Sequence, residues 1–331
     1  NIPMRLLKGL LTAVGCAYGR RSAGGAIIPT MQLVFLGSPS FAVPSLDALL
    51  AAGHHVGLVV SQPDRPAGRG RRSRPPAVAV YAREHGLPLW QTASLKGPRA
   101  EARLREVGAD AMALAAFAAL VPANVLAIAP ILNVHPSLLP RWRGASPIQA
   151  ALEAGDLETG VSIIQLVEDL DAGPILLQER TPIRDEDDYL TLEPRLARLG
   201  ARLLVRALAE APTPRPQDES QATFRHRIQR DEARIDWTRF ADTIWRQVRA
   251  LRGWPQAFTT ADGRLLKVLR AWPVEATDVP GTLLVRDGQP IVATGRGGLR
   301  LDEVVPEGKQ PQAGTDFVRG YPRLIGHRLG S

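Results

Sequence analysis

The chain has 331 residues, of which 45% are hydrophobic and 22% charged, a balance typical of a globular protein long enough for two domains rather than a disordered or fibrous chain. Its single cysteine, Cys16, cannot form an internal disulfide, and no uncharged apolar run approaches the roughly 20 residues needed to cross a bilayer. We therefore expect a protein of the cytoplasm that does not enter a membrane.

The formal net charge of +8 is unevenly distributed along the chain. Residues 1–30 carry four basic side chains and no acidic one, residues 31–212 carry 18 basic against 19 acidic, and residues 213–331 carry 19 against 14. The basic last part could contact a polyanion, although a solvated arginine-rich surface explains the charge equally well.

Residues 1–30 show neither a helical nor a strand period, and they precede Met31, where a buried strand pattern begins. We expect Met31 to be the natural start and 1–30 to be an N-terminal extension outside the fold. A targeting peptide is the alternative, but the stretch has few serines and no convincing cleavage site.

After Met31, short apolar runs alternate with longer amphipathic ones. The pattern predicts strands at 32–36, 56–61, 87–90, 110–116, 131–135, 161–168 and 174–182. It predicts helices at 41–52, 75–85, 98–107, 145–154 and 190–208. Such alternation is typical of βαβ units, so we predict a Rossmann-like α/β domain with a mostly parallel sheet.

The proline-rich stretch 211–216 interrupts any helix and predicts an extended linker. Beyond it we expect a short helix near 238–251, followed by short strands separated by glycine turns, which indicate a small β-barrel. This part contains Trp237, Trp245, Trp254 and Trp272. We expect them to pack in the barrel core rather than to stack on bases.

The segment 132–144 is the richest in residues that can carry chemistry. Asn133 and His135 are two positions apart at the end of a predicted strand, so their side chains share a face at the edge where parallel sheets bind ligands. An amide and an imidazole side by side can donate hydrogen bonds to a developing oxyanion. A structural role is the alternative for such a pair.

Asp171 strengthens the catalytic interpretation of this pair. It lies in a glycine-containing turn between the two last predicted strands of the domain. A carboxylate there could hold His135 in one tautomer and order a water molecule for proton transfer.

Seven motifs together resemble the methionyl-tRNA formyltransferases, a family dependent on 10-formyltetrahydrofolate. They are VFLGSPSFAVPSL near the start, SQPDRPAGRGRR at 61–72, NVHPSLLPRWRGASPIQ at 133–149, GDLETGVSI at 155–163, LDAGPIL at 170–176, EARIDW at 232–237 and the tail pattern from Gly281 to Gly308. The resemblance runs from Met31 to the C-terminus. It implies a catalytic domain over 31–210, a linker over 211–222 and an OB-like tRNA-binding domain over 223–331.

The resemblance also implies the chemistry. By position, Asn133, His135 and Asp171 match the family's catalytic trio, and the stretch Ser137, Leu138, Leu139 and Pro140 matches its folate-contacting turn. The expected reaction moves the formyl group of 10-formyltetrahydrofolate to the α-amine of methionine on initiator tRNA. We expect no metal, no covalent enzyme intermediate and a monomeric protein.

The loop from Gln62 to Pro75 carries five arginines against one aspartate, a composition that suits contact with phosphates as well as a solvated surface loop. It matches the family's tRNA-inserting segment, in which Arg69 takes the position of the key arginine. The resemblance thus implies tRNA contacts for Arg65, Arg69, Arg71 and Arg72. The neighbouring residues Arg141, Trp142 and Arg143 could bind the folate tail or the tRNA end, or could simply pack around the folate turn.

The chain departs from the family at Phe117 and Ala118, where relatives usually have tyrosine and glycine beside the pterin pocket. The trio itself also occurs in glycinamide ribonucleotide formyltransferases and in the hydrolase domain of formyltetrahydrofolate dehydrogenase, so it does not select a substrate. The arginine-rich loop and the basic second domain favour tRNA. A sugar-nucleotide formyltransferase and an RNA-binding protein without turnover are the competing hypotheses.

Overall fold

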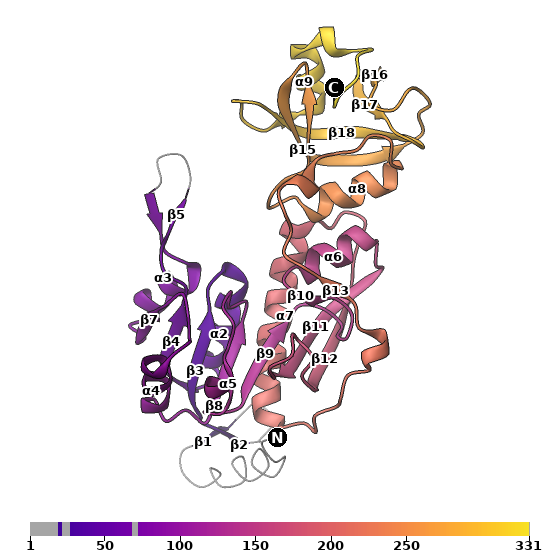
Figure 1. Cartoon of the computed structure of the whole chain (residues 1–331). Coiled ribbons are helices and arrows are strands. Elements are labelled where there is room, and N and C mark those ends of the chain that lie inside the picture. The colour runs from indigo at the N-terminus through magenta and orange to yellow at the C-terminus, as the bar shows by residue number, and fades with distance from the viewer. Residues whose placement is uncertain (1–18, 22–26, 68–71, 331) are drawn as a thin grey trace. The chain divides into compact units, whose positions relative to one another are not determined.

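A computed structural model describes residues 19–21, 27–67 and 72–330 (Figure 1). Within the expected N-terminal extension, β1 (Gly19–Arg21) and β2 (Ile27–Pro29) pair with each other antiparallel in a sheet of their own. The sequence analysis found no strand there, because strands of three residues are too short to show a period.

The chain divides into two compact units, neither of which is continuous in sequence. The first comprises 1–144, 159–181 and 193–224, and the second comprises 145–158, 182–192 and 225–331. Two short segments of the predicted catalytic range thus belong to the second unit.

The first unit is built around a seven-stranded sheet with strand order β12-β11-β9-β8-β3-β4-β7 (Figure 1). Its strands are β3 (Gln32–Gly37), β4 (His55–Ser61), β7 (Leu89–Gln91), β8 (Ala111–Ala115), β9 (Ile131–His135), β11 (Glu158–Gln165) and β12 (Ile175–Pro182). Strands β9, β8, β3, β4 and β7, which are neighbours in this order along the sheet, pair parallel with one another. Strand β11 pairs antiparallel with β9. The predicted mostly parallel α/β sheet is confirmed. It could be predicted because β3, β8 and β9 are buried on both faces, so each of them appears in the sequence as a continuous apolar run.

Helices connect the strands at the predicted places. They are η1 (Ser40–Ala42), α2 (Val43–Ala51), α3 (Ala77–Glu84), α4 (Pro98–Glu106), α5 (Ala123–Leu126), α6 (Pro147–Ala154) and α7 (Tyr189–Glu210). One core cluster joins the sheet residues Val34, Met112 and Leu114 to Leu104 of α4 and Val125 of α5. The sequence analysis missed α5, since four residues make only one helical turn.

Helix α6 shows how local sequence sets its ends. Pro147 stands at its first position, where the missing N–H leaves no intrahelical bond unmade, and Gly155 ends it with φ +73. In the second unit, Arg246 donates to the carbonyl of Ala154, and a Cβ on Gly155 would lie 2.3 Å from the Arg246 guanidinium carbon. The glycine therefore ends the helix and leaves room for a cation at its negative end.

The second unit carries α8 (Ala241–Ala250), a six-stranded antiparallel sheet and α9 (Gly314–Gly320). The strands are β14 (Phe258–Ala261), β15 (Arg264–Val274), β16 (Leu283–Arg286), β17 (Gln289–Ala293), β18 (Gly298–Pro306) and β19 (Gln312–Ala313). The order is β14-β15-β18-β17-β16, with β19 on β18, and this sheet confirms the expected small barrel-like domain.

The chain end bridges the two outer strands of this sheet. Beside β16, Leu283 donates to the carbonyl of His327 and Leu329 donates to the carbonyl of Gly281, while Gly330 donates to the carbonyl of Thr260 in β14. These bonds occupy backbone groups at the edges of β14 and β16, which would otherwise be free to pair with another chain.

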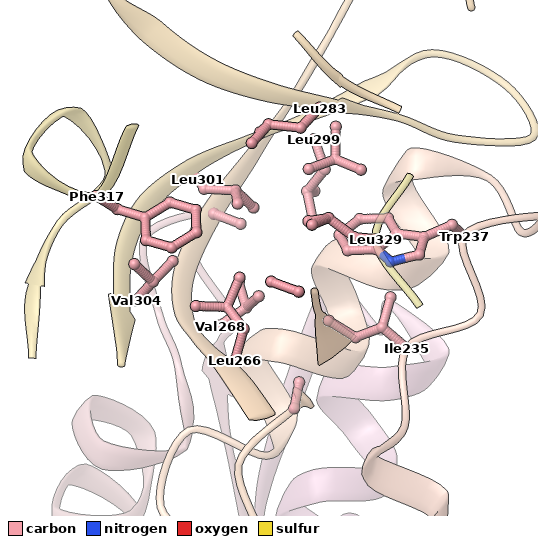
Figure 2. Packing of buried hydrophobic residues seen from close by; sticks show 14 of the residues in the cluster. Ile235, Trp237, Leu266, Val268, Leu283, Leu299, Leu301, Val304, Phe317 and Leu329 are labelled. Carbon is pink, nitrogen blue, oxygen red and sulfur yellow. The ribbon is translucent and has the colours of Figure 1, made fainter. Parts of the chain in front are cut away.

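Figure 2 shows the core of this unit, where Trp237, Leu301 and Phe317 lie among buried aliphatic side chains. The Trp237 indole nitrogen donates to Thr259 Oγ1 over 3.0 Å, which satisfies its only polar group. The prediction of core tryptophans holds for Trp237 and in part for Trp245, but it is wrong for Trp254 and Trp272, which are 56% and 38% exposed.

The predicted linker is not a bare spacer. Ile175 of β12 and Arg215 exchange two backbone hydrogen bonds of 2.8 Å, so the linker lies along the edge of the first unit's sheet. It continues through η2 (Glu219–Gln221) to β13 (Phe224–Arg225), which pairs with β10 (Arg143–Gly144).

Candidate active site

The candidate site lies at one edge of the parallel sheet in the first unit. Strands β3, β4, β8 and β9 are mutually parallel, so their carboxyl ends share this edge, and His135 is the last residue of β9. Asn133 and His135 are only 6% and 4% exposed, as the alternation along the strand requires of two residues on one covered face.

The structure brings Asp171 to this pair across 38 residues of sequence. Asn133 Nδ2 lies 3.4 Å from Asp171 Oδ1, and His135 Nδ1 lies 3.6 Å from Asp171 Oδ2. The backbone N–H of Gly144 donates to the same Oδ2 over 2.8 Å. One carboxylate thus orients the amide, the imidazole and a peptide N–H.

The imidazole faces hydrogen-bond acceptors at both nitrogens. Nε2 of His135 lies 2.9 Å from the carbonyl oxygen of Trp142, and Nδ1 faces Asp171. A neutral imidazole can donate from only one nitrogen, whereas the imidazolium donates from both. Whichever ring nitrogen carries a hydrogen, an acceptor oxygen therefore lies beside it.

The turn that carries Asp171 has two unusual backbone features. Asp171 has φ +49, in the left-handed region that few residues other than glycine, asparagine and aspartate adopt. At Gly173 a Cβ would lie 1.8 Å from the carbonyl oxygen of Gln165, so only glycine fits. Because the backbone of this turn packs so closely against Gln165, the turn fixes the position of the Asp171 carboxylate.

The expected folate-contacting turn, residues 137–140, is held by polar contacts that the sequence analysis did not identify. Ser162 Oγ donates to the carbonyl of Ser137 and accepts from the N–H of Leu139 at 3.1 Å. Gln178 Nε2 donates to both Ser162 Oγ and the carbonyl of Leu139. A serine and a glutamine in ordinary strand patterns gave no signal of this role.

Of the segment 141–143, Arg143 has the clearest environment. It is 2% exposed and makes a two-pronged pair with Glu219, with nitrogen to oxygen distances of 2.7 and 2.8 Å. The hydrogen bond from Arg143 lowers the pKa of the Glu219 carboxyl. The packing alternative is therefore right for Arg143. Arg141 lies over the ring of Trp142, 4.3 Å from its centroid.

The arginine-rich loop begins and ends in a hairpin formed by β5 (Arg65–Ala67) and β6 (Arg72–Arg74). Arg65 is directly opposite Arg74, and its guanidinium donates to Gln62 Oε1 over 3.1 Å. Arg69 and Arg71 lie outside the described residues, as does the side chain of Arg72.

The departure at 117–118 has a specific local form. Phe117 is buried in the core beside the sheet, and the left-handed residue is Ala116, with φ +47. Ala118 does not adopt a positive φ, so its backbone conformation does not require the glycine that relatives usually have there.

Within the described residues, no group of three or more histidine, cysteine, aspartate or glutamate side chains could hold a metal ion. None of the helices in the same part of the chain is long and apolar enough to cross a membrane.

Comparison with known families matches both parts of the chain. Residues 31–208 match the Formyl transferase family and residues 227–322 match the Formyl transferase, C-terminal domain, family. A methionyl-tRNA formyltransferase from Methylococcus capsulatus is 45% identical over 309 residues, which cover 91% of this chain and 100% of the relative. One from Gluconobacter oxydans is 46% identical over 306 residues, covering 90% and 100%.

Solved structures share the fold at lower identity. HypX from Aquifex aeolicus in complex with tetrahydrofolic acid superposes with a TM-score of 0.62 at 18% identity, covering 89% of this chain and 48% of HypX. WlaRD, a sugar 3N-formyl transferase, superposes with a TM-score of 0.62 at 15% identity, covering 85% and 99%. Because the sequence matches extend over nearly all of the chain from residue 31 onward, the chain belongs to the formyl transferase family.

Proposed function

We propose that this protein transfers the formyl group of 10-formyltetrahydrofolate to the α-amino group of methionine carried by initiator tRNA, acting as a monomer in the cytoplasm. The observation that carries the proposal is the identity of about 45% to methionyl-tRNA formyltransferases over their entire length. The polar cluster at the end of β9 supports it, because it offers what acyl transfer to an amine requires.

In the proposed reaction the amine of the substrate attacks the formyl carbon, and negative charge develops on the formyl oxygen. The Asn133 amide carries two N–H groups, of which the Asp171 contact takes one, so the other can donate to that oxygen. The imidazole of His135, which lies against the same carboxylate, stabilises that charge when it is protonated. Removing one such donor in an acyl-transfer site lowers the rate by about 10²–10³-fold.

Asp171 serves the proton transfer. Once attacked, the substrate nitrogen must lose a proton, and the N10 atom of the folate must gain one as it leaves. A carboxylate that touches both Asn133 and His135 can accept this proton directly, through water or through the imidazole, and can return it to the leaving nitrogen. The nucleophile belongs to the substrate, so the enzyme forms no covalent bond.

The test is formylation by purified protein of charged initiator and elongator methionyl-tRNAs in parallel, with a dTDP-linked aminosugar as a third acceptor. We expect rapid formylation of the initiator and much slower formylation of the elongator. Formylation of the aminosugar alone would favour the sugar-nucleotide alternative. Tight tRNA binding without turnover would favour an RNA-binding protein.

We propose further that Arg65, Arg69, Arg71 and Arg72 contact the tRNA. The pairing of Arg65 with Arg74 across the hairpin supports this, because like charges directly opposite each other destabilise a strand pair. A phosphate near both guanidinium groups would offset the repulsion. The hairpin is thus better suited to a polyanion than to water alone.

Arg69→Ala is expected to weaken productive engagement of tRNA and to reduce the slope of log kcat/KM against log salt by about one. Measurement of kcat/KM for the initiator between about 50 and 200 mM KCl checks this. Arg99→Ala, which removes an exposed arginine of α4 outside the loop, is the matched control. An Arg69→Ala slope equal to that of the wild type would refute the loop assignment.

A further inference from the structure

The linker carries a glutamine whose side chain contacts the turn that bears Asp171. Gln217 Nε2 donates to two backbone carbonyls of that turn, those of Asp171 and Gly173, each over 2.7 Å. Both N–H groups of the amide are therefore used on the turn.

The other end of the same amide is also held. Gln217 Oε1 accepts from Arg143 Nη2 at 2.8 Å and from Arg143 Nε at 3.1 Å. Two further guanidinium hydrogens, one on Nη1 and one on Nη2, are donated to Glu219. We call Gln217, Arg143 and Glu219 the clamp.

Through the residues before and after it in the chain, Arg143 also connects the clamp to His135 and to Asp171. The residue before it, Trp142, offers the carbonyl that faces His135 Nε2, and the residue after it, Gly144, donates its N–H to Asp171 Oδ2. The N–H of Arg143 itself donates to the carbonyl of Thr223, the residue that follows the linker. The two peptide groups that contact His135 and Asp171 are thus those on either side of Arg143, whose guanidinium is buried in the clamp.

Two residues held by the clamp have an unfavourable backbone. Trp142 has φ +62 and Asp171 has φ +49. Residues other than glycine rarely adopt this region, and they keep the conformation only where surrounding contacts impose it. The hydrogen bonds of Gln217 and Arg143 are such contacts, one on each strained segment.

We propose that Gln217 is a positioning residue for the transfer reaction: through its two bonds to the Asp171 turn and its bonds to Arg143, it holds the Asp171 carboxylate in register with His135 and Asn133. The inference rests on the proposed function for its catalytic consequence. Its structural part, the placement of Asp171, stands independently of the acceptor.

Gln217→Glu separates the two ends of the amide. The glutamate carboxylate still offers an oxygen to both hydrogen bonds from Arg143. It has no N–H groups for the two carbonyls of the turn, and its second, negatively charged oxygen would lie against them. Displacement of a reacting group by about 1 Å can lower the rate by about 100-fold, so we expect kcat to fall by about 10- to 100-fold. We expect KM for folate and for tRNA to stay within about threefold of wild type, because the changed contacts lie behind the reacting groups.

Gln221→Glu is the matched control, since Gln221 lies in the same segment and its amide donates to exposed Asp218. We expect wild-type kcat from it. Gln217→Leu removes the amide N–H groups and the amide oxygen without adding a charge, so it shows whether an effect of Gln217→Glu comes only from the added charge. The thermal unfolding midpoint of each variant shows whether it folds.

Two further measurements distinguish positioning from general support of the fold. In a double-mutant cycle, Gln217→Glu should have little additional effect once Asp171→Asn is present, because the two act through one carboxylate. Amide hydrogen exchange at Gly144 should quicken at least tenfold in Gln217→Glu, since its acceptor on Asp171 has moved, while exchange at Leu139, bonded to Ser162, stays as in wild type.

The outcomes for this inference and for the proposed function are distinct. Absence of methionyl-tRNA formylation by the wild-type protein contradicts the proposed function, and the Gly144 exchange rate then still tests the clamp. A folded Gln217→Glu protein with wild-type kcat, with full additivity in the cycle, or with unchanged Gly144 exchange, overturns the positioning role.

Discussion

Replacing His135 by alanine is expected to lower kcat for formylation of initiator methionyl-tRNA by about 100-fold or more. The loss follows from the removal of an imidazole that lies beside Asn133 and is oriented by the Trp142 carbonyl and Asp171. Single-turnover assays with saturating folate and enzyme measure the chemical step directly.

Binding of tRNA should be nearly unaffected by this substitution, because His135 is 96% buried at the sheet edge while the arginines of the loop are intact. A filter-binding comparison with wild type checks this. His85→Ala, at an exposed histidine after α3, serves as the control and should retain the wild-type rate. Unchanged turnover of folded His135→Ala protein would remove the imidazole from the mechanism.

The second large effect is expected at Asp171. Asp171→Asn keeps the shape of the side chain, and asparagine tolerates the φ of +49 at least as well as aspartate. The change removes the negative charge that faces His135 and the basic oxygen needed for proton transfer. Loss of the carboxylate partner of a catalytic histidine in the Ser-His-Asp triad lowers kcat by about 10⁴-fold, so we expect a fall between about 10²- and 10⁴-fold here.

A chemical-rescue experiment distinguishes the two roles of this carboxylate, proton acceptor and negative charge beside His135. Rescue of the Asp171→Asn rate by added small carboxylates such as formate or acetate would indicate the proton-transfer role, whereas loss of charge alone predicts no rescue. Asp169→Asn, which changes an exposed carboxylate two residues earlier, is the control and should keep the wild-type rate. A folded Asp171→Asn enzyme within tenfold of the wild-type rate would show that the carboxylate is dispensable for the chemical step.

Much of the fold could be predicted because its signals are local. The strands around β3, β8 and β9 are buried on both faces, so they appear in the sequence as uninterrupted apolar runs of the length of a strand. The leucines of α7 recur on one face, and those on that face are all buried, namely Leu192, Leu196, Leu199, Leu203 and Leu204. The prediction failed where segments are very short, as at α5, and for the exposed Trp254.

The composition of the candidate site was predictable for a different reason. Asn133 and His135 are neighbours on one strand, so a period of two places them together without knowledge of the rest of the fold. Asp171 was connected to them by its place in a glycine-containing turn between two predicted strands and by the resemblance of its motif to a family. Gln217 gave no signal at all, because a glutamine in a proline-rich stretch is ordinary linker composition.

The sequence by itself therefore determined the parallel α/β sheet, the small second domain and the identities of three polar residues with the right chemistry. Only the tertiary structure decided how a carboxylate 38 residues away meets the amide, and how a glutamine 46 residues beyond that carboxylate holds its turn. The physical reason is that periodicity arises from backbone geometry within a few residues, whereas hydrogen bonds between distant segments depend on how the whole unit packs.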